Sequence, residues 1–371
     1  MLRVGIVGWR GMVGSVLMER MINENDFSGL DPLFFSTSQA GQSGPDIGIS
    51  TPPVEDAHNL ESLREMDVII SCQGGNYTKN VHPALRQADW NGYWIDAAST
   101  LRMKSNSVIV LDPMNRNLID AALNDGIKDY IGGNCTVSLM LMALGGLFKN
   151  DLIEWLSSMT YQAASGAGAK NMRELVMQMQ TIGNRTSQLL ADPDAVIADL
   201  DNNVTETLRS ANFPIQHFGA PLAASLIPWI DRAMDNGQTK EEWKGYAETN
   251  KILGRENNAV PIDGQCVRIG AMRCHSQAFT IKLTQNVPLA DIESMITEHN
   301  QWVQLIPNEK EATLKELTPA RISGTLRIPI GRMRKLNIGP EYITAFSVGD
   351  QLLWGAAEPL RRMLKILVES I

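Results

Sequence analysis

The sequence contains little of what marks secreted, metal-binding or membrane proteins. It has four cysteines in 371 residues, at positions 72, 135, 266 and 274. That is too few for a disulfide framework, and none of them forms a CxxC metal-binding pair. We therefore expect free thiols in a reducing cytoplasm and no metal site. The longest strongly apolar run, residues 137–148, is shorter than the roughly 18 to 20 residues that a membrane span requires, so it predicts a buried helix.

An excess of positive charge is also absent. The chain has 33 Lys and Arg residues against 41 Asp and Glu residues, which gives a formal net charge of −8. This balance argues against nucleic acid or an anionic membrane as a partner, although it leaves room for a small basic pocket. The first residues lead directly into a strand-like segment without an apolar signal segment, so we expect no export and a cytoplasmic location.

The composition is that of a globular protein, with 44% hydrophobic and 20% charged residues. At roughly 100 to 200 residues per domain, the length predicts two domains. Up to about residue 133, short β-branched runs alternate with helical stretches, and the predicted strands are 4–7, 33–36, 68–71, 93–95 and 108–111. This alternation is typical of βαβ units, so we expect an α/β fold that begins with a Rossmann-like parallel-sheet domain.

After residue 133 the pattern changes to that of an α+β domain. Predicted helices at 170–183 and 205–211 are followed by predicted strands at 266–271 and 278–283. In the first domain, the Gly- and Pro-rich segment 39–59 predicts an exposed loop. Over 358–370, apolar residues at 360, 363, 364, 367 and 368 form the stripe of an amphipathic helix, which must pack against another element.

A glycine-rich turn follows the first predicted strand. It reads Gly8-Trp9-Arg10-Gly11-Met12-Val13-Gly14 and leads into a helix. Such a turn lets the backbone approach a pyrophosphate, whose negative charge is favoured at a helix start. The spacing GxxGxxG departs from the usual GxGxxG, so a tight turn without a ligand stays an alternative. The strand and the helix around it favour a dinucleotide site.

The end of the second predicted strand indicates which dinucleotide binds. An NAD-specific site would carry Asp or Glu there to bind the ribose hydroxyls, whereas this strand ends in Ser36-Thr37-Ser38. No carboxylate there would repel a 2′-phosphate, the hydroxyls can bond it, and Arg10 can add positive charge. We therefore predict NADP as the cofactor.

The strongest candidate nucleophile is Cys135. It follows Gly132-Gly133-Asn134 and precedes the apolar helix, so we expect it at a helix N-terminus. There the helix dipole and free amides stabilise a thiolate and lower its pKa from about 8.5, and the same amides can hold an oxyanion. Cys72 lies on an apolar run and is predicted to be a buried hydrophobe.

Among the five histidines, His275 is the best candidate for the base, because it lies in a polar segment beside a predicted strand. The neighbouring Cys274 is a rival nucleophile, but it lacks the surroundings of a helix start. The other histidines are expected in loops of the first domain or at the surface, namely His58 and His82 in loops and His217 and His299 at the surface.

Five motifs, in order, resemble those of the aspartate-semialdehyde dehydrogenases of the bacterial, Gram-negative type, and the resemblance covers almost the whole chain. They are residues 8–14 (GWRGMVG), 132–138 (GGNCTVS), 161–168 (YQAASGAG), 241–244 (EEWK) and 268–276 (RIGAMRCHS). The resemblance implies an NADP-binding domain over 1–133 with 355–371, the last helix returning to the first domain. It also implies a catalytic and dimerisation domain over 134–354, and a homodimer.

The family reaction, as the resemblance implies it, interconverts L-4-aspartyl phosphate and L-aspartate 4-semialdehyde with NADPH, in lysine, threonine and methionine biosynthesis. Cys135 is similar to the nucleophile that forms a thioester, His275 to the acid/base, and Gln162 to the residue that orients the acyl intermediate. The implied cofactor-binding residues are Gly8, Arg10, Gly11, Met12, Val13, Thr37, Ser38, Gln73, Ser165, Gly166 and Gln351. Of these, Gln73, Ser165, Gly166 and Gln351 are placed near the nicotinamide end.

The substrate residues follow from the same resemblance and agree with the chemistry. A guanidinium suits the substrate carboxylate and an anion its ammonium, and the matching residues are Arg268 and Glu241. The phosphate needs cations, matched by Arg102 and Lys244, with Asn134 nearby. Glu241 and Lys244 are three residues apart on a helix, so they can face one pocket, although an exposed ion pair is the alternative. A capping box of Thr239 and Glu242 leaves Glu241 free for function.

Other functions remain open at this level. A thiol hydrolase would keep the cysteine and histidine and pass the thioester to water, but the glycine turn and the paired cations argue against it. A nucleotide-binding regulatory protein would bind the cofactor without any covalent chemistry. Relatives that act on phosphorylated glyceraldehyde or on acylated glutamyl substrates surround the nucleophile differently from residues 133–136.

Overall fold

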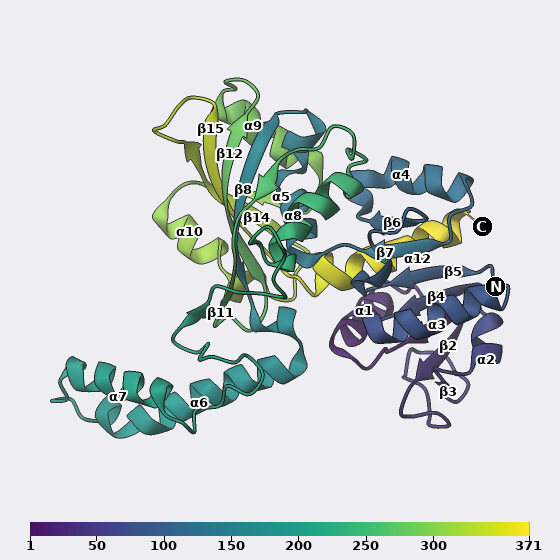
Figure 1. Ribbon diagram of the computed structural model, residues 1–371, viewed down its shortest axis with the longest axis horizontal. Helices are drawn as coiled ribbons and strands as arrows, with labels where there is room; N and C mark the ends of the chain where they lie inside the picture. The colour runs from purple at the N-terminus through teal and green to yellow at the C-terminus, as the bar shows by residue number, and fades with distance from the viewer. Residues whose placement is uncertain (371) are drawn as a thin grey trace.

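The computed structural model describes residues 1–370 and confirms an α/β fold that begins with a Rossmann-like parallel sheet (Figure 1). The sheet has seven strands in the order β3-β2-β1-β4-β5-β7-β6, and every pair in it is parallel. Its strands are β1 (Leu2–Val7), β2 (Leu30–Ser36), β3 (Glu55–Asp56), β4 (Val68–Ser71), β5 (Tyr93–Asp96), β6 (Ser107–Val110) and β7 (Asp129–Gly132). The helices between them are α1 (Met12–Asn23), α2 (Leu60–Arg64), α3 (Gly75–Gln87) and α4 (Asp112–Asn124).

All five strands predicted for this domain are present, but β3, which lies inside the predicted loop 39–59, was not predicted, and neither was β7. Strand β7 is only four residues long, and its first residue is Asp129, which sequence patterns disfavour in a strand. The structure accommodates this carboxylate because His82 Nε2 (2.9 Å) and Arg86 Nη2 (2.6 Å) both contact it. The prediction that His82 lies in a loop is therefore wrong, since it is a buried residue of α3.

The second domain is built on a mixed sheet, as expected for an α+β domain. Its strands run in the order β13-β14-β15-β12-β8-β11-β9, and β10 pairs with β8. Their bounds are β8 (Ile153–Gln162), β9 (Leu226–Ile227), β10 (Ile262–Asp263), β11 (Cys266–Ile269), β12 (His275–Leu283), β13 (Val303–Leu305), β14 (Ile328–Lys335) and β15 (Tyr342–Gly349). The helices that cover or connect it are α5 (Cys135–Lys149), α8 (Lys240–Ile252), α9 (Leu289–His299), α10 (Lys310–Glu316) and α11 (Pro319–Ile322).

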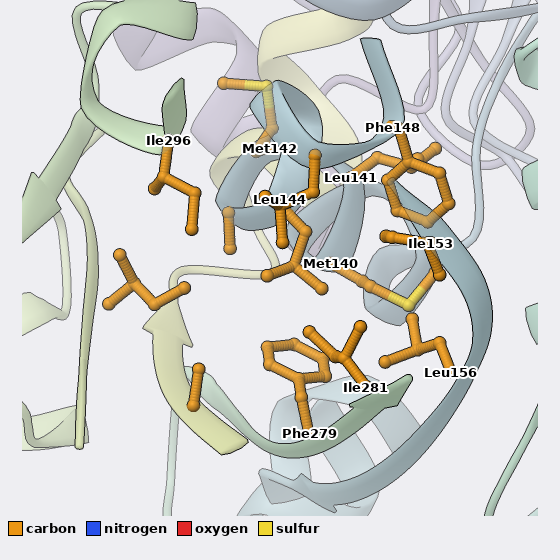
Figure 2. Close-up of a cluster of buried hydrophobic side chains, with 14 of the residues drawn as sticks. Met140, Leu141, Met142, Leu144, Phe148, Ile153, Leu156, Phe279, Ile281 and Ile296 are labelled. Carbon is orange, nitrogen blue, oxygen red and sulfur yellow. The ribbon is translucent and has the colours of Figure 1, made fainter. Parts of the chain in front are cut away.

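Helix α5 is the apolar run that the sequence predicted to be buried. Every residue from Thr136 to Phe148 is buried, because the helix has β8, β12, β14 and β15 on one side and α8 and α9 on others. Figure 2 shows Met140, Leu144 and Phe148 packed above the strand residues of this core. His299, expected at the surface, is half-buried at the end of α9 beside Gly145 of α5. This packing fixes the first turn of α5 relative to both sheets.

Two long helices extend from the second domain as an arm (Figure 1). They are α6 (Ala169–Ala191) and α7 (Ile197–Arg209), which pack against each other. Both are longer than predicted, because exposed polar residues continue each helix beyond its apolar stripe. Several apolar side chains of the arm are nevertheless exposed, namely Val176, Met177, Met179, Leu190 and Ile197.

The last predicted amphipathic helix is confirmed as α12 (Glu358–Ser370), and it returns to the first domain. It packs on β5, β6, β7 and α1, where Leu360, Met363, Leu364 and Leu367 join the core of the parallel sheet. Val368, the fifth residue of the predicted stripe, is instead 48% exposed. A bidentate contact of Arg362 with Asp112 of α4 (Nε–Oδ1 2.8 Å) anchors the helix further.

Within residues 1–370, no helix is both long and apolar enough to cross a membrane. In the same part of the chain, His, Cys, Asp and Glu side chains nowhere gather in a group of three that could hold a metal ion.

Candidate active site

Cys135 is the first residue of α5, as predicted, and Asn134 caps the helix. The Asn134 side-chain oxygen accepts hydrogen bonds from the backbone N–H groups of Thr136 (3.0 Å) and Val137 (3.2 Å). Two of the amides expected to hold an oxyanion are therefore already occupied. Asn134 itself is buried, and its Nδ2 donates to Glu241 Oε1 (3.0 Å), so this residue connects the helix start to the predicted substrate residues.

The structure brings Cys135 and His275 together across 140 residues of sequence, with Sγ 3.4 Å from Nε2. His275 is the first residue of β12, inside the strand that was predicted to begin at residue 278. Its Nδ1 accepts a hydrogen bond from the Ala163 N–H (3.1 Å), which assigns the proton of the neutral ring to Nε2, facing the sulfur. The neutral ring is therefore a hydrogen-bond donor at the reacting position.

Burial governs the charge of this pair. Burial, together with the nearby Glu241, raises the pKa of the Cys135 thiol to about 12, although the cations of the site oppose this effect. Burial and the nearby Arg268 lower the pKa of His275 to about 3. The predicted lowering of the Cys135 pKa is thus wrong, because the helix start alone does not offset the loss of solvation. Cys135 and His275 both rest in their neutral forms.

A chain of buried charges surrounds the thiol. Glu241 accepts from Lys244 Nζ (2.8 Å) and from Gln162 Nε2 (3.2 Å). Although burial opposes its charge, the contact with Lys244 holds the pKa of Glu241 at about 2, below its usual range. Asp231 is a second partner of Lys244, at 3.1 Å. The alternative of an exposed Glu241–Lys244 pair is excluded, because both residues are buried.

The helix that carries this chain begins as predicted. In α8, the Thr239 N–H donates to the Glu242 carboxylate (2.6 Å) and the Glu242 N–H donates to Thr239 Oγ1 (3.3 Å), which is a capping box. Glu242 is thereby used at the helix end, and Glu241 faces the interior.

The two predicted arginines are also buried, and each is held by a backbone carbonyl. Arg268 Nη1 donates to the Ala163 carbonyl (2.8 Å), and Arg102 Nε donates to the Gly132 carbonyl (2.6 Å). Arg102 also pairs with Glu248 (Nη1–Oε1 3.2 Å), whose other oxygen accepts from the Asn134 N–H (2.7 Å). Glu248 thus links the predicted phosphate site to the residue beside the thiol.

Sequence reasoning missed Glu248, Asp231 and Gly355. Glu248 could have been found, because it follows Glu241 and Lys244 by seven and four residues and so shares their helix face. Gly355 lies in the π-helical turn η3 (Leu353–Ala357), where a Cβ would come within 2.7 Å of Cys135 Cβ. No local pattern of the sequence indicates that close approach.

A cavity of about 580 Å³ opens in front of Cys135 and gathers most of the predicted site. Its lining includes Met12, Val13, Arg102, Asn134, Gln162, Ser165, Gly166, Glu241, Lys244, Arg268 and Gln351. The side chains of Gln351 and Ser165 are hydrogen-bonded, and Gln351 Oε1 accepts from the Cys274 N–H (2.8 Å). Cys274, the rival nucleophile, is fully buried and lies outside this lining.

A second cavity, of about 320 Å³, lies on the other side of the glycine turn. Its lining includes Gly8, Arg10, Gly11, Thr37, Ser38 and Gln73, and no carboxylate among the described residues. Gln73 was expected near the nicotinamide end, but it lies here and donates to Thr37 Oγ1 (3.2 Å). Because Gly11 lines this cavity and Met12 lines the one at Cys135, the turn connects the two.

The glycines of this turn have structural reasons as well. Gly8 has φ +76°, and a Cβ on it would lie 2.8 Å from the backbone of Cys72 and Gln73. A Cβ on Gly14 would lie 2.2 Å from the Gly8 carbonyl oxygen. Close packing of the glycine turn against α1 therefore accounts for Gly14, while the open cavity beside Gly8 and Gly11 is what a pyrophosphate requires.

The fold and the thiol site together define a dehydrogenase of the semialdehyde dehydrogenase class. Residues 3–122 match the sequence model of the semialdehyde dehydrogenase NAD binding domain, and residues 144–354 match that of the semialdehyde dehydrogenase dimerisation domain. The aspartate semialdehyde dehydrogenase from Francisella tularensis is 49% identical, with a TM-score of 0.94, over 99% of this chain and 100% of that one. The chain belongs to the aspartate-semialdehyde dehydrogenase family, an oxidoreductase family of amino-acid biosynthesis.

More distant solved structures share the fold. The aspartate semialdehyde dehydrogenase II from Vibrio cholerae, complexed with ASA, is 23% identical and has a TM-score of 0.79 over 100% of this chain and 98% of that one. The Candida albicans aspartate semialdehyde dehydrogenase with NADP is 15% identical, with a TM-score of 0.67 over 99% and 98%. At these identities, the likeness is one of architecture.

Proposed function

We propose that this protein catalyses the reversible, NADP-dependent reductive dephosphorylation of L-4-aspartyl phosphate to L-aspartate 4-semialdehyde through a thioester on Cys135. The observation that carries the proposal is the 3.4 Å approach of Cys135 Sγ to His275 Nε2 at a cavity where Arg268, Glu241, Lys244 and Arg102 converge. A thiol, a proton donor, an amino-acid site and a phosphate site are the parts that this reaction needs.

In the oxidative direction, the Cys135 thiol adds across the aldehyde C=O bond: the sulfur bonds to the carbon and the thiol proton passes to the oxygen, which gives a thiohemiacetal. The Nε2–H of His275 faces the sulfur, so it can donate to the oxygen of this adduct and stabilise the negative charge that develops there as the C–S bond forms. Met12, Val13, Ser165 and Gly166 would hold the nicotinamide half of NADP+, which would supply the acceptor for the hydride on that carbon, and the hydroxyl proton would be released as the thioester forms. Gln162, buried between Thr160 and Glu241, is placed to orient the acyl group of the thioester that results.

The thioester retains the free energy of the oxidation until phosphate attacks it. A phosphate oxygen adds to the acyl carbon, the C–S bond breaks, and the sulfur leaves with the electron pair. Lys244 and Arg102 supply the positive charge for binding the phosphate, and Asn134 lines the same cavity as these cations and the thiol. Lys244, Arg102 and Arg268 partly oppose the rise in the pKa of the Cys135 thiol, so their positive charges favour the departing thiolate in this step.

The amino-acid portion of the substrate is recognised by opposite charges. Arg268 suits the α-carboxylate through its planar guanidinium, and Glu241, charged because Lys244 keeps its pKa low, suits the ammonium. Both residues line the Cys135 cavity. A substrate that lacks the α-carboxylate would leave the buried guanidinium of Arg268 without an anionic partner, with only its hydrogen bond to the Ala163 carbonyl.

NADP rather than NAD is proposed because the cavity beyond the glycine turn favours a 2′-phosphate. Thr37 and Ser38 offer hydroxyls, Arg10 lines the same cavity, and no carboxylate among the described residues does so. The nicotinamide half would lie along Met12 and Val13 toward Ser165, Gly166 and Gln351. An NAD site would instead place a carboxylate at the end of β2.

We also propose a homodimer in the cytoplasm, divided into the predicted domains 1–133 with 355–371 and 134–354. The match to a dimerisation domain supports the dimer, and the exposed apolar side chains of the arm are the surface that pairing would cover. The packing of α12 on the parallel sheet supports the division of the chain.

The proposed function is tested by phosphate-dependent reduction of NADP+ with aspartate semialdehyde, followed at the nicotinamide absorbance. Parallel assays contain NAD+ in place of NADP+, or no phosphate. We expect a rate that requires phosphate and that falls by more than 10-fold with NAD+. A rate indifferent to phosphate would support the thiol hydrolase instead, and cofactor binding without turnover would support a regulatory protein.

Replacing Cys135 by Ser should remove turnover but leave the binding of NADP+ intact. Since an alkoxide is harder to form than a thiolate and an ester holds less free energy than a thioester, turnover should fall by at least about 1,000-fold. NADP+ affinity, measured by fluorescence quenching, should stay within about 2-fold of the wild type. Cys72→Ser serves as the matched control, and near-normal activity of the Cys135 variant would refute the assignment.

A further inference from the structure

A third cavity, of about 480 Å³, lies behind the phosphate-binding side of the site. We name it the basic vestibule and define it by Arg102, Lys104, Arg232, Lys240, Lys244 and Glu248. Ser99, Arg102 and Lys244 line both the vestibule and the Cys135 cavity. These three residues therefore form the boundary between the vestibule and the Cys135 cavity, and both cavities reach Arg102 and Lys244.

The vestibule differs sharply from the Cys135 cavity in charge. Its lining has five cations and one carboxylate, Glu248, whereas the Cys135 cavity has three cations, Arg102, Lys244 and Arg268, against the two carboxylates Asp231 and Glu241. This concentration of positive charge occurs in a protein with a formal net charge of −8. A cleft lined by one sign of charge raises the local concentration of the opposite ion.

The cations of the vestibule are of two kinds. The inner two are buried and engaged, Arg102 with Glu248 and Lys244 with Glu241 and Asp231. The outer three are Lys104, Arg232 and Lys240, and within residues 1–370 no carboxylate oxygen lies within 4.0 Å of their side-chain nitrogens, although the backbone N–H of Arg232 donates to Asp231 Oδ1 (2.8 Å). Lys104 and Arg232 are exposed, so their charges act on ions that approach from solvent.

We propose that inorganic phosphate reaches the Cys135 thioester through the basic vestibule, by an entrance separate from that of the dinucleotide and the aldehyde. The inference rests on the proposed function, in which phosphate is the last reactant to arrive. At that stage the acyl group occupies the front of the Cys135 cavity and the dinucleotide lies along Met12 and Val13. The vestibule reaches Arg102 and Lys244 from the other side.

Along the proposed route of phosphate, the cations become more buried, from the exposed Lys104 and Arg232 to the buried Lys244 and Arg102. A phosphate dianion is attracted by Lys104 and Arg232, passes Lys240, and is received by Lys244 and Arg102 at the shared boundary. There one of its oxygens attacks the acyl carbon, the C–S bond breaks, and the thiolate departs with the electron pair. In the reductive direction, the phosphate that Cys135 displaces from aspartyl phosphate leaves by the same route.

Charge reversal at the exposed end tests the route. The double variant Lys104→Glu/Arg232→Glu is compared with Lys79→Glu/Lys310→Glu, which changes the net charge equally at exposed positions outside the vestibule. For the first variant we expect kcat/KM for phosphate to fall by roughly 10-fold at low ionic strength, within the range of electrostatic steering. The deficit should shrink to about 2-fold at 0.5 M salt, where screening shortens the reach of these charges.

Two further readouts separate this effect from general damage. KM values for aspartate semialdehyde and NADP+ should stay within about 2-fold of the wild type, and so should the phosphate-independent burst of NADPH that precedes thioester breakdown. The separate entrance would be overturned if kcat/KM fell equally for phosphate, aspartate semialdehyde and NADP+, or if kcat/KM for phosphate did not fall at all. A loss of the native oligomeric state in size-exclusion chromatography would overturn it as well, because the vestibule would then be a subunit interface.

The outcome is distinguishable from failure of the proposed function. If the wild-type enzyme reduces NADP+ without phosphate, the reaction itself is wrong. If the wild type requires phosphate and the vestibule variant matches its control, the reaction stands and only the entrance is wrong.

Discussion

At the scale of single residues, the site is controlled by solvation more than by the helix start. The sequence places Cys135 at the first turn of α5, and this alone predicts a thiolate. The structure adds burial and the nearby carboxylate of Glu241, which together raise the pKa of the thiol. The resting pair is therefore a neutral thiol beside a neutral imidazole, and reactivity has to be induced when substrates bring their own charges into the cavity.

Alkylation by iodoacetamide reports this directly. Because the pKa of Cys135 is raised to about 12, the thiolate fraction of the free enzyme should increase about 10-fold per pH unit from pH 7 to pH 9. The rate of inactivation should rise in parallel without levelling off. Cys135→Ser labelling supplies the background of the other thiols. A rate that is already maximal at pH 7 would show a preformed thiolate and contradict the neutral pair.

Mutation of Glu248 tests whether it positions Arg102, because its carboxylate contacts both Arg102 and the backbone N–H of Asn134 beside the thiol. In Glu248→Gln, the buried Arg102 loses its counter-charge while the side chain keeps its size. We expect KM for phosphate to rise by about 10-fold and the free energy of unfolding to fall by about 1–3 kcal/mol, as for a buried charge left unpaired.

The matched control for that variant is Glu256→Gln, which removes an equal charge from an exposed position. It should change both quantities little, by less than about 0.5 kcal/mol in stability. For both variants, steady-state kinetics measures KM for phosphate and urea unfolding measures the free energy of unfolding. If Glu248→Gln alters stability but leaves KM for phosphate unchanged, Glu248 supports the fold without positioning Arg102.

At the scale of elements, the turn η3 determines where α5 can begin. Gly355 of this turn lies against Cys135, and Gln351 just before it is hydrogen-bonded to Ser165. The Cys135 thiol is therefore enclosed between its own helix and the segment that leads into α12. The close contact of η3 with Cys135 is possible only because Gly355 has no Cβ.

Gly355→Ala should separate activity from folding. The new Cβ would lie 2.7 Å from Cys135 Cβ and 2.9 Å from its Cα, so the start of α5 or η3 must shift. We expect at least a 100-fold loss of kcat, since displacements near 1 Å at a reacting group have effects of this size. Thermal unfolding, followed by circular dichroism, should remain cooperative.

The comparison variant is Gly183→Ala in α6, where nothing lies within 4 Å of the new Cβ. This helix-interior change should raise stability by roughly 0.5–1 kcal/mol and leave kcat unaltered. Equal kinetics for the two variants would mean that the contact of η3 with Cys135 has no part in catalysis.

At the scale of the whole molecule, the buried histidine makes stability depend on pH. His275 has a pKa lowered to about 3 in the folded state and about 6.5 when unfolded, so the unfolded chain binds the additional proton between these values. Stability is therefore complete above pH 6.5 and declines as the pH falls toward 3. Glu241, with its pKa lowered to about 2, adds a loss of the same sign only below about pH 4.5.

Between pH 6.5 and 4.5, His275→Gln should thus lose less stability than the wild type. Each pH unit in this window is worth up to about 1.4 kcal/mol for one such group. Urea unfolding at a series of pH values measures the slopes, and His217→Gln, at an exposed site, is the control. Parallel slopes for wild type and His275→Gln would show that the folded protein protonates His275 as readily as the unfolded chain does.

The features that sequence could predict are those fixed by neighbouring residues. The glycine turn, the start of α5, the capping box of α8 and the helix α12 all follow from spacings of a few residues. The features that it could not predict depend on distant contacts. Asn134 meets Glu248 across 114 residues, and Gly355 meets Cys135 across a longer stretch of chain. The same holds for the pKa values, which depend on burial.

The return of α12 to the first domain has a consequence for the order of folding during synthesis. Leu360, Met363, Leu364 and Leu367 complete the core beside strands made more than 200 residues earlier. On the ribosome, the face of the parallel sheet that α12 covers stays exposed until the whole second domain has been translated. A growing chain of this protein therefore exposes an apolar surface for most of its translation, and chaperones would engage it there.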